Sequence, residues 1–241
     1  HLFQPRYVGP DPNNLTEEQS TIRQSIIRTR PHTGISGPFG PWLSIPSIAS
    51  PAEQLGRVCR YGMPSLSFRE SELIILLTGA RHSSHAEFDI HYNEAIRAGI
   101  DKSVIHSIPR DEDFSVEAVM DRVVPSLLAE EGDSDTTDVH NTKTKNKNKN
   151  KNSTDERNDD DNTNDLEKRK QREVEIVKFT AELLETSTVK DDTYDRAKDV
   201  IGGGRDEVLV EITSIVGYYT FDAYTLNVFR IPTTKPKPSS T

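Results

Sequence analysis

Two helical patterns follow each other between Ser67 and Gly99, and this stretch constrains the fold more than any other. Ser67 opens the capping-box pattern SFRE, so a helix is predicted from there to about Ala80, with the apolar body LIILL. A second helix is predicted from about Ser84 to Ala98, because a glycine directly after it is the residue expected just past a helix end. The centre of the fold is therefore predicted to be a pair of helices.

Polar side chains of three chemical kinds are expected to meet on this helix pair. Ser84, Glu87 and His91 stand three and four residues apart, so they share one face of the second helix. Glu72 lies on the first helix, just before its apolar run. We expect a hydroxyl, two carboxylates and an imidazole to converge where the two helices cross.

The spacing Glu72-x11-Ser84-x2-Glu87-x3-His91 resembles the Glu-x11-Cys-x2-Cys-x3-His signature of the AhpD-like, carboxymuconolactone decarboxylase superfamily. Glu72 and His91 match the family Glu and His, while Ser84 and Glu87 stand where redox-active members carry two cysteines. Four segments look like family helices, and in this order they cover most of the chain outside residues 131–168: GPFGPWLSIPSIA, SELIILLTGA, AEFDIHYNEAIRAGI and GYYTFDAYTLNVF.

The resemblance implies an all-α, AhpD-like helical bundle that forms homo-oligomers. It also implies a cofactor-free lyase that acts on a small carboxylated lactone or related cyclic acid. In that reaction His91 would be the general acid and base, and Glu72 and Glu87 would orient it, shuttle the proton, or do both. Arg69 is a candidate for binding the substrate carboxylate, since a guanidinium binds carboxylates bidentately. Dithiol peroxidase chemistry is disfavoured, because the cysteine pair is absent.

Other interpretations of the same residues stay open. His91 can be a core histidine, the two glutamates can be solvated helix positions, and Ser84 can be a helix cap. Tyr218 is expected either to line a substrate pocket or to pack in an aromatic core. A non-catalytic AhpD-fold protein, used for binding or assembly, is the alternative function. It would differ from the enzyme in having no closed pocket shared by the carboxylates and the imidazole.

A metal site is a further alternative, because His82 and His85 add imidazoles near Glu87 and His91. However, His85 and His91 are about 120° apart around a helix. The set therefore does not converge, and no metal is predicted.

Charge and cysteine content exclude several classes of function. The net charge of −9 leaves no basic face for phosphates, which argues against nucleic-acid binding. No apolar run approaches the length of a membrane span. The single cysteine excludes an intramolecular disulfide. It stands on a helix that Pro51 is predicted to open, on an apolar side with Leu55 and Val58, so Cys59 is interpreted as an inert core residue.

One domain in two parts is predicted. Residues 14–130 form its N-terminal part with the central helix pair, and residues 169–231 are helices that complete it. Between them, residues 131–168 contain the run KTKNKNKNKNKNSTDERNDDDNTND, which has almost no apolar residue and is predicted to be a disordered insertion.

The predictions for the last helix and for the cellular compartment rest on weaker sequence signals. The segment RDEVLVEITSIVGYYTFDAYTLNVF also suits a strand, but it lacks strict alternation, and the resemblance favours a buried helix. The chain begins with His1 and carries sequons at Asn14 and Asn152. Secretion and a cytoplasmic location both stay open.

Overall fold

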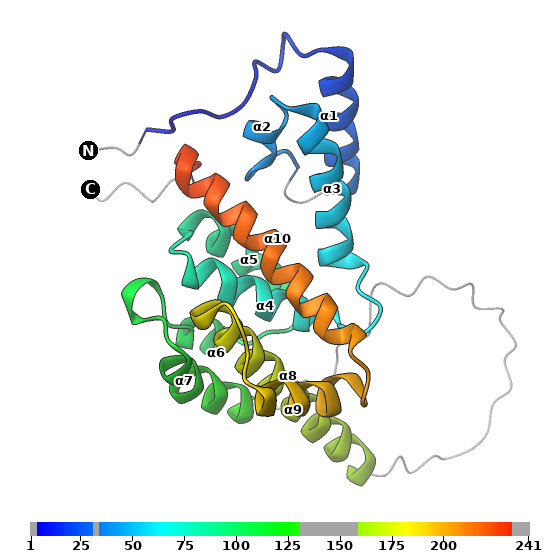
Figure 1. The fold of residues 1–241 in the computed structure, drawn as a ribbon, viewed down its shortest axis with the longest axis vertical. Helices are drawn as coiled ribbons and strands as arrows, with labels where there is room; N and C mark the ends of the chain where they lie inside the picture. Colours follow the sequence, from blue (N-terminus) through cyan, green and yellow to red (C-terminus); the bar gives the residue numbers. More distant parts are fainter. Residues whose placement is uncertain (1–3, 31–33, 131–158, 233–241) are drawn as a thin grey trace, which may run out of the picture.

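The computed structural model describes residues 4–30, 34–130 and 159–232, and of residues 159–163 it describes the backbone only. These ranges are helical and contain no strand, which confirms the all-α prediction (Figure 1). The elements are α1 (Glu17–Thr29), α2 (Phe39–Trp42), α3 (Pro46–Tyr61), α4 (Phe68–Arg81), α5 (His85–Arg97), α6 (Lys102–Ser107), the 3-10 turn η1 (Asp111–Asp113), α7 (Val116–Ala129), α8 (Asp159–Thr186), α9 (Asp191–Gly202) and α10 (Glu207–Phe229).

Capping side chains set where the helices begin. The Ser67 hydroxyl accepts a hydrogen bond from the Glu70 backbone N–H, and the Glu70 carboxylate accepts one from the Ser67 N–H at 2.7 Å. Thr16 and Gln19 form the same reciprocal pair before α1. These bonds satisfy backbone donors that a helix start leaves unpaired, and the capping box predicted at Ser67 is confirmed.

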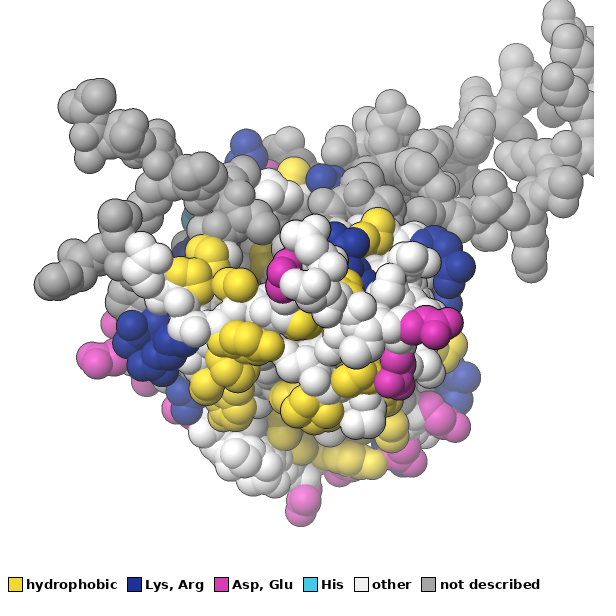
Figure 2. Space-filling view, turned by 90° about the horizontal axis from the view of Figure 1, so that it is seen from above, with side chains coloured by type: hydrophobic (Ala, Val, Ile, Leu, Met, Phe, Trp, Pro, Cys, Tyr) yellow, Lys and Arg dark blue, Asp and Glu magenta, His cyan; other side chains and the backbone are white. Residues whose placement is uncertain are grey.

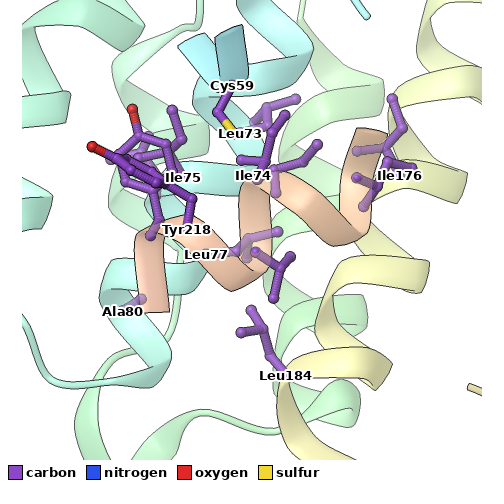
Figure 3. Packing of buried hydrophobic residues seen from close by; sticks show 14 of the residues in the cluster. Cys59, Leu73, Ile74, Ile75, Leu77, Ala80, Ile176, Leu184 and Tyr218 are labelled. Atoms are coloured by element: carbon purple, nitrogen blue, oxygen red, sulfur yellow. The ribbon is translucent and has the colours of Figure 1, made fainter. Parts of the chain in front are cut away.

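Helix α4 is the centre of the hydrophobic core. Every residue from Arg69 to Ala80 is buried, because α5, α8 and α10 all pack against this helix (Figure 3). A helix that is apolar around most of its circumference needs neighbours on several sides. The run Leu73–Leu77 meets this requirement with five consecutive side chains that have no exposed area. Any polar group on α4 is therefore buried together with the core.

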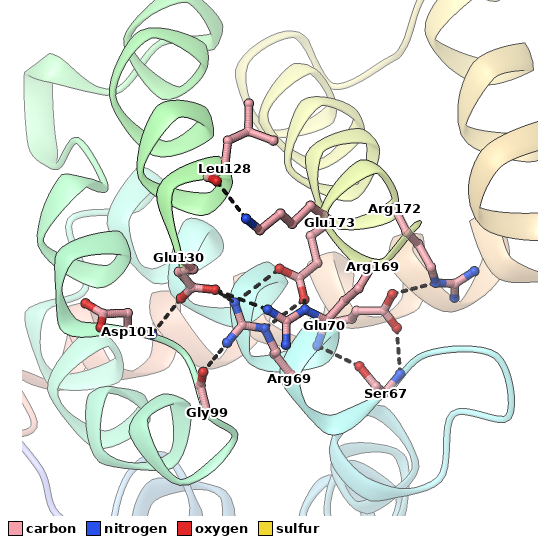
Figure 4. Close-up of polar contacts among 11 residues, drawn as sticks. Ser67, Arg69, Glu70, Gly99, Asp101, Leu128, Glu130, Arg169, Arg172 and Glu173 are labelled. Atoms are coloured by element: carbon pink, nitrogen blue, oxygen red, sulfur yellow. Dashed lines mark hydrogen bonds and ion pairs between the residues drawn. The ribbon is translucent and has the colours of Figure 1, made fainter. Parts of the chain in front are cut away.

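Helix α8, which follows the predicted insertion in sequence, is held to the start of α4 by charge pairs (Figure 4). The Arg69 guanidinium donates to Glu173 of α8 at 2.7 Å and also pairs with Glu130, just past the end of α7. Arg172 of α8 donates to Glu70 at 2.5 Å. Segments on either side of residues 131–168 are thereby joined in one core.

The predicted insertion is shorter at its C-terminal boundary than the sequence indicated. Helix α8 begins at Asp159, so residues 159–168, which the sequence assigns to the insertion, are helical. Leu166 is half-buried and Lys170 is buried, donating from Nζ to the Leu128 carbonyl at 2.8 Å. These contacts support the earlier turns. The prediction for residues 131–158 lies outside the described residues.

Helix α3 differs from its prediction in both its start and its faces. It begins at Pro46, and Pro51 lies inside it rather than at its first turn. Pro51 is the sixth residue of the helix, beyond the first N–H groups that have no partner within it, so the proline leaves the Ser47 carbonyl without its usual intrahelical donor. Cys59 is buried as expected, and burial raises the pKa of its thiol to about 11. Leu55 and Val58, however, point to solvent.

Helix α10 crosses the front of the bundle in Figure 1 and confirms the helical interpretation of the last apolar segment. It packs against α3, α4, α5, α8 and α9. The Trp42 indole donates from Nε1 to the Thr225 hydroxyl at 3.0 Å, which fixes α2 against it. None of the helices in the described ranges has the length and apolarity needed to cross a bilayer.

Candidate functional site

The His91 imidazole lies between two carboxylates. Its Nδ1 is 2.7 Å from Oε2 of Glu72, and its Nε2 is 3.1 Å from Oε1 of Glu87. All three side chains are at least 95% buried. Such an imidazole has acceptors on both sides, which favours the form that carries two protons.

The local fold brings these three groups together. Glu87 and His91 are one turn apart on α5, and Glu72 faces them from the first half of α4. The two helices meet closely at Gly79, where a Cβ would lie 3.4 Å from the Phe88 backbone nitrogen. Ser84 donates its backbone N–H to the Gly79 carbonyl at 2.9 Å, which closes the turn between the helices. The imidazole therefore meets both carboxylates as predicted, but the Ser84 hydroxyl, which was expected to join them, makes no hydrogen bond to them.

Arg60 of α3 adds a positive charge next to Glu72, on the side away from His91. Its Nε lies 3.4 Å from Oε1 of Glu72, and its Nη2 lies 3.0 Å from Oε2 of Glu94. Sequence reasoning missed Arg60 and Glu94. A charged residue next to a cysteine on the buried face of an amphipathic helix was an available signal for Arg60.

Asp222 of α10 completes the site on the other side of Glu87. It is buried and shares a hydrogen bond with Glu87. Tyr219, one turn earlier on α10, places its ring edge-on to the His91 imidazole, with 5.1 Å between the ring centroids. Asp222 was also missed by sequence reasoning, although a lone acid within an apolar helical run is a recognisable signal for a buried functional group.

Burial and neighbouring charges decide which of these groups carry protons. Burial alone lowers the pKa of His91, but the charges of Glu72 and Glu87 outweigh it and raise that pKa to about 9. Burial, followed by the charge of Glu87, raises the pKa of Asp222 well above its usual range. At neutral pH His91 is therefore an imidazolium, and Asp222 keeps its proton to a higher pH than an exposed aspartate does.

A cavity of about 30 Å³ borders this cluster. It has room for one water molecule or a few at most. The acid–base groups Glu87, His91 and Asp222 face it, together with two arginines, two tyrosines and the segment before and within α2. The lining residues are Arg30, Ser36, Gly37, Pro38, Phe39, Arg60, Glu87, Ile90, His91, Tyr218, Tyr219 and Asp222.

Tyr218 is the one predicted substrate-binding residue that lines the cavity, and burial raises the pKa of its phenol well above its usual range. Ser84 is buried at the start of α5, but it does not line the cavity, and its hydroxyl has no hydrogen-bond partner among the described residues. Arg69 lies elsewhere, with its guanidinium taken by Glu130 and Glu173. The guanidiniums at the cavity are those of Arg30 and Arg60.

His82 and His85, the other histidines of the metal alternative, do not join the site. His82 lies 3.0 Å from the Thr220 hydroxyl, and His85 is exposed and lies 3.7 Å from Asp111. Across the described ranges, no group of three or more His, Cys, Asp or Glu side chains is arranged to hold a metal ion. Comparison with protein-family models, with curated proteins and with solved structures gave no match.

Proposed function

We propose that this protein is a cofactor-free acid–base enzyme, a lyase of the carboxymuconolactone decarboxylase type. The observation that carries the proposal is the His91 imidazole, held between Glu72 and Glu87 at the edge of a cavity. Buried acid–base groups with shifted pKa values occur more often at functional sites than elsewhere. The family resemblance in spacing points to the same residues.

The chain's own groups suit a decarboxylation in which an enolate forms and is then protonated. The His91 imidazolium is the proton source, because its pKa of about 9 keeps it charged at neutral pH. Glu72 holds the ring from Nδ1 and offsets its charge, while Arg60 in turn offsets Glu72. Glu87 borders both Nε2 and the cavity, so it is placed to pass a proton between the ring and a reactant.

Asp222 adds a neutral hydrogen-bond donor to this set. Its raised pKa favours the protonated carboxyl, whose single O–H can donate either to Glu87 or to a developing enolate oxygen. The substrate carboxylate, which the sequence assigned to Arg69, is instead expected to meet Arg30. The Arg30 guanidinium is stacked on Phe39 and pairs with Glu53 at 3.1 Å.

Substrate size places a condition on this proposal. A small cyclic acid is larger than the 30 Å³ cavity, since pockets for such ligands commonly measure about 300 Å³ or more. Residues 36–39 form one wall of the cavity. We therefore expect this wall to move outward when substrate binds.

The same observation on size favours the alternative, a non-catalytic binding or assembly protein. In that case the line Arg60, Glu72, His91 and Glu87 is a buried network whose alternating charges compensate one another. Dithiol peroxidase activity stays disfavoured, because Cys59 is the single cysteine and it is buried.

Release of CO₂ from a carboxylated γ-lactone tests the proposal. The wild-type protein should release CO₂, and His91→Gln should lower the rate by about 10²-fold or more, the usual contribution of a general acid. His82→Gln is the matched control, because it changes a half-buried histidine that does not line the cavity, and it should keep the wild-type rate. Lactone binding by calorimetry without CO₂ release would instead support the binding protein.

A further inference from the structure

The outward face of α10 carries a stripe of uncharged side chains with coiled-coil spacing. Successive positions along it are four, three, four, three and four residues apart, which keeps them on one side of the helix. The two charged residues within this stretch, Glu211 and Asp222, are both buried. The stripe consists of Val210, Ser214, Gly217, Phe221, Tyr224 and Val228.

The stripe is open to solvent. Val210 is 64% exposed, Tyr224 54% and Val228 55%. Gly217 stands at its middle, and a Cβ built there would meet no atom within 4 Å. A helix surface with a glycine at its centre lets another backbone or a large side chain approach closely.

Helix α3 lies beside α10 and also exposes apolar side chains. Cys59 contacts the Ser214 carbonyl at 3.7 Å, and Gly56 faces the Tyr218 ring, so the two helices lie side by side. Leu55 stands one turn before Cys59 and is half exposed, as is Val58. Figure 2 looks down on the end of the molecule where α1 and the C-terminal end of α10 lie, and it shows hydrophobic side chains interspersed with charged ones there.

We propose that a second copy of this chain docks on the stripe, with the two α10 helices antiparallel about a two-fold axis near Tyr219. In this register, each residue faces the residue of the other copy that lies equally far from Tyr219 in the opposite direction along the sequence. The half of the stripe with the smaller side chains thereby faces the half with the larger side chains in the other copy. The facing pairs are Val210 with Val228, Ser214 with Tyr224, and Gly217 with Phe221.

The match in size favours a second copy over an unrelated partner. A two-fold interface must be complementary to itself, and here the space beside Gly217 receives the exposed side of the other copy's Phe221 ring, which is stacked on Trp42 of its own chain at 4.7 Å. The stripe offers no exposed charge to attract an acidic or basic partner. Its aromatic residues and lack of charge are typical of interface centres.

The available area is compatible with a weak to moderate dimer. The half-exposed apolar side chains of α10, together with Leu55 and Val58, offer roughly 500 Å² if each leaves on the order of 90 Å² exposed. A standard interface buries about 800 Å² on each partner, so apolar atoms would supply most of it and backbone and polar atoms the rest.

Gly217→Leu is the sharpest test. In a single chain the new side chain has open space, and leucine favours a helix more than glycine does, so the fold is not harmed. In the dimer it occupies the place of the Phe221 ring. Sedimentation equilibrium at micromolar to 100 µM concentration should give twice the 27.1 kDa chain mass for the wild type. The dissociation constant should rise at least tenfold for Gly217→Leu.

Charge exchange tests the register. Val210→Lys and Val228→Glu should each weaken association at least tenfold, and the double variant should restore it, because each lysine then faces a glutamate of the other copy. Val200→Lys on α9 is the control for adding a lysine at a solvent-facing valine, and it should associate like the wild type. A monomeric wild type, or a Gly217→Leu protein that associates normally, would overturn the proposal. A double variant as weak as the single ones would overturn the antiparallel register.

Discussion

The Nδ1 atom of His91 lies 2.7 Å from the Glu72 carboxylate, and this pair joins α5 to α4 inside the core. Neither group is free to exchange its partner for water, because His91 is 4% exposed and Glu72 is fully buried. A buried imidazolium without such a partner would lose most of its charge. The protonation of His91 is therefore coupled to the packing of the two central helices.

His91→Gln should change how stability depends on pH. The folded pKa of about 9 is above the unfolded value of 6.5, so the stabilisation is complete below pH 6.5 and is lost as the pH rises through 9. The shift corresponds to about 3 kcal/mol. The free energy of unfolding of the wild type should therefore fall toward that of His91→Gln between pH 6 and pH 10, as measured by urea denaturation.

The control for this experiment is His82→Gln. Burial lowers the pKa of His82, so its loss should not produce a difference that shrinks between pH 6 and pH 10. Curves for the wild type and His91→Gln that stay parallel across this range would show that His91 is not charged in the folded protein.

Asp222→Asn should behave differently, because the amide has nearly the shape of a protonated carboxyl. The raised pKa of Asp222 means that its stabilisation is present below about pH 4, its unfolded pKa, and is lost as the pH rises. The asparagine variant has no such loss, so it should gain stability relative to the wild type between pH 4 and pH 7. Asp222→Ala should instead be less stable throughout, by about 1–3 kcal/mol, because Glu87 loses a hydrogen-bond donor. A carboxylate at position 222 that is already ionised would give the asparagine variant no gain.

The central helix pair could be predicted from the sequence because its signals are local. The capping box at Ser67, the glycine after α5 and the spacing of Glu87 and His91 all act within one or two helical turns. The same short-range rules place Glu72 near His91 once the two helices are known to pack.

Arg60 and Asp222 each carry a sequence signal of burial, but that they join this site could not be predicted, because they come from distant helices. Arg60 and Asp222 reach the cavity from α3 and α10, and their direction depends on how those helices rotate about their axes. Arg69 shows the same limit. An arginine near the start of α4 is equally suited to a substrate or to Glu173, and only the position of α8 decides between them.

Arg69→Ala should destabilise the fold strongly. Its removal leaves the buried carboxylate of Glu173, which is 1% exposed, without its closest cation. Breaking a buried pair in this way commonly costs about 3–5 kcal/mol. Arg122→Ala is the matched control, since its pair with Asp113 is exposed at 3.8 Å and should be worth less than about 1 kcal/mol. Equal losses in urea denaturation would mean that the network in Figure 4 does not hold α8 in place.

Gly56→Ala should disturb the packing of Tyr218, which lines the cavity. A Cβ at Gly56 would overlap the phenol oxygen and ring of Tyr218, which is 5% exposed and has little space to move. Forcing an extra methyl into such a site commonly costs about 1–3 kcal/mol. Gly217→Ala is the matched control on the neighbouring helix. It meets no atom within 4 Å and should gain up to about 1 kcal/mol when measured in dilute protein. An alanine at position 56 that is as harmless as one at position 217 would show that α3 and α10 are not packed against each other at Tyr218.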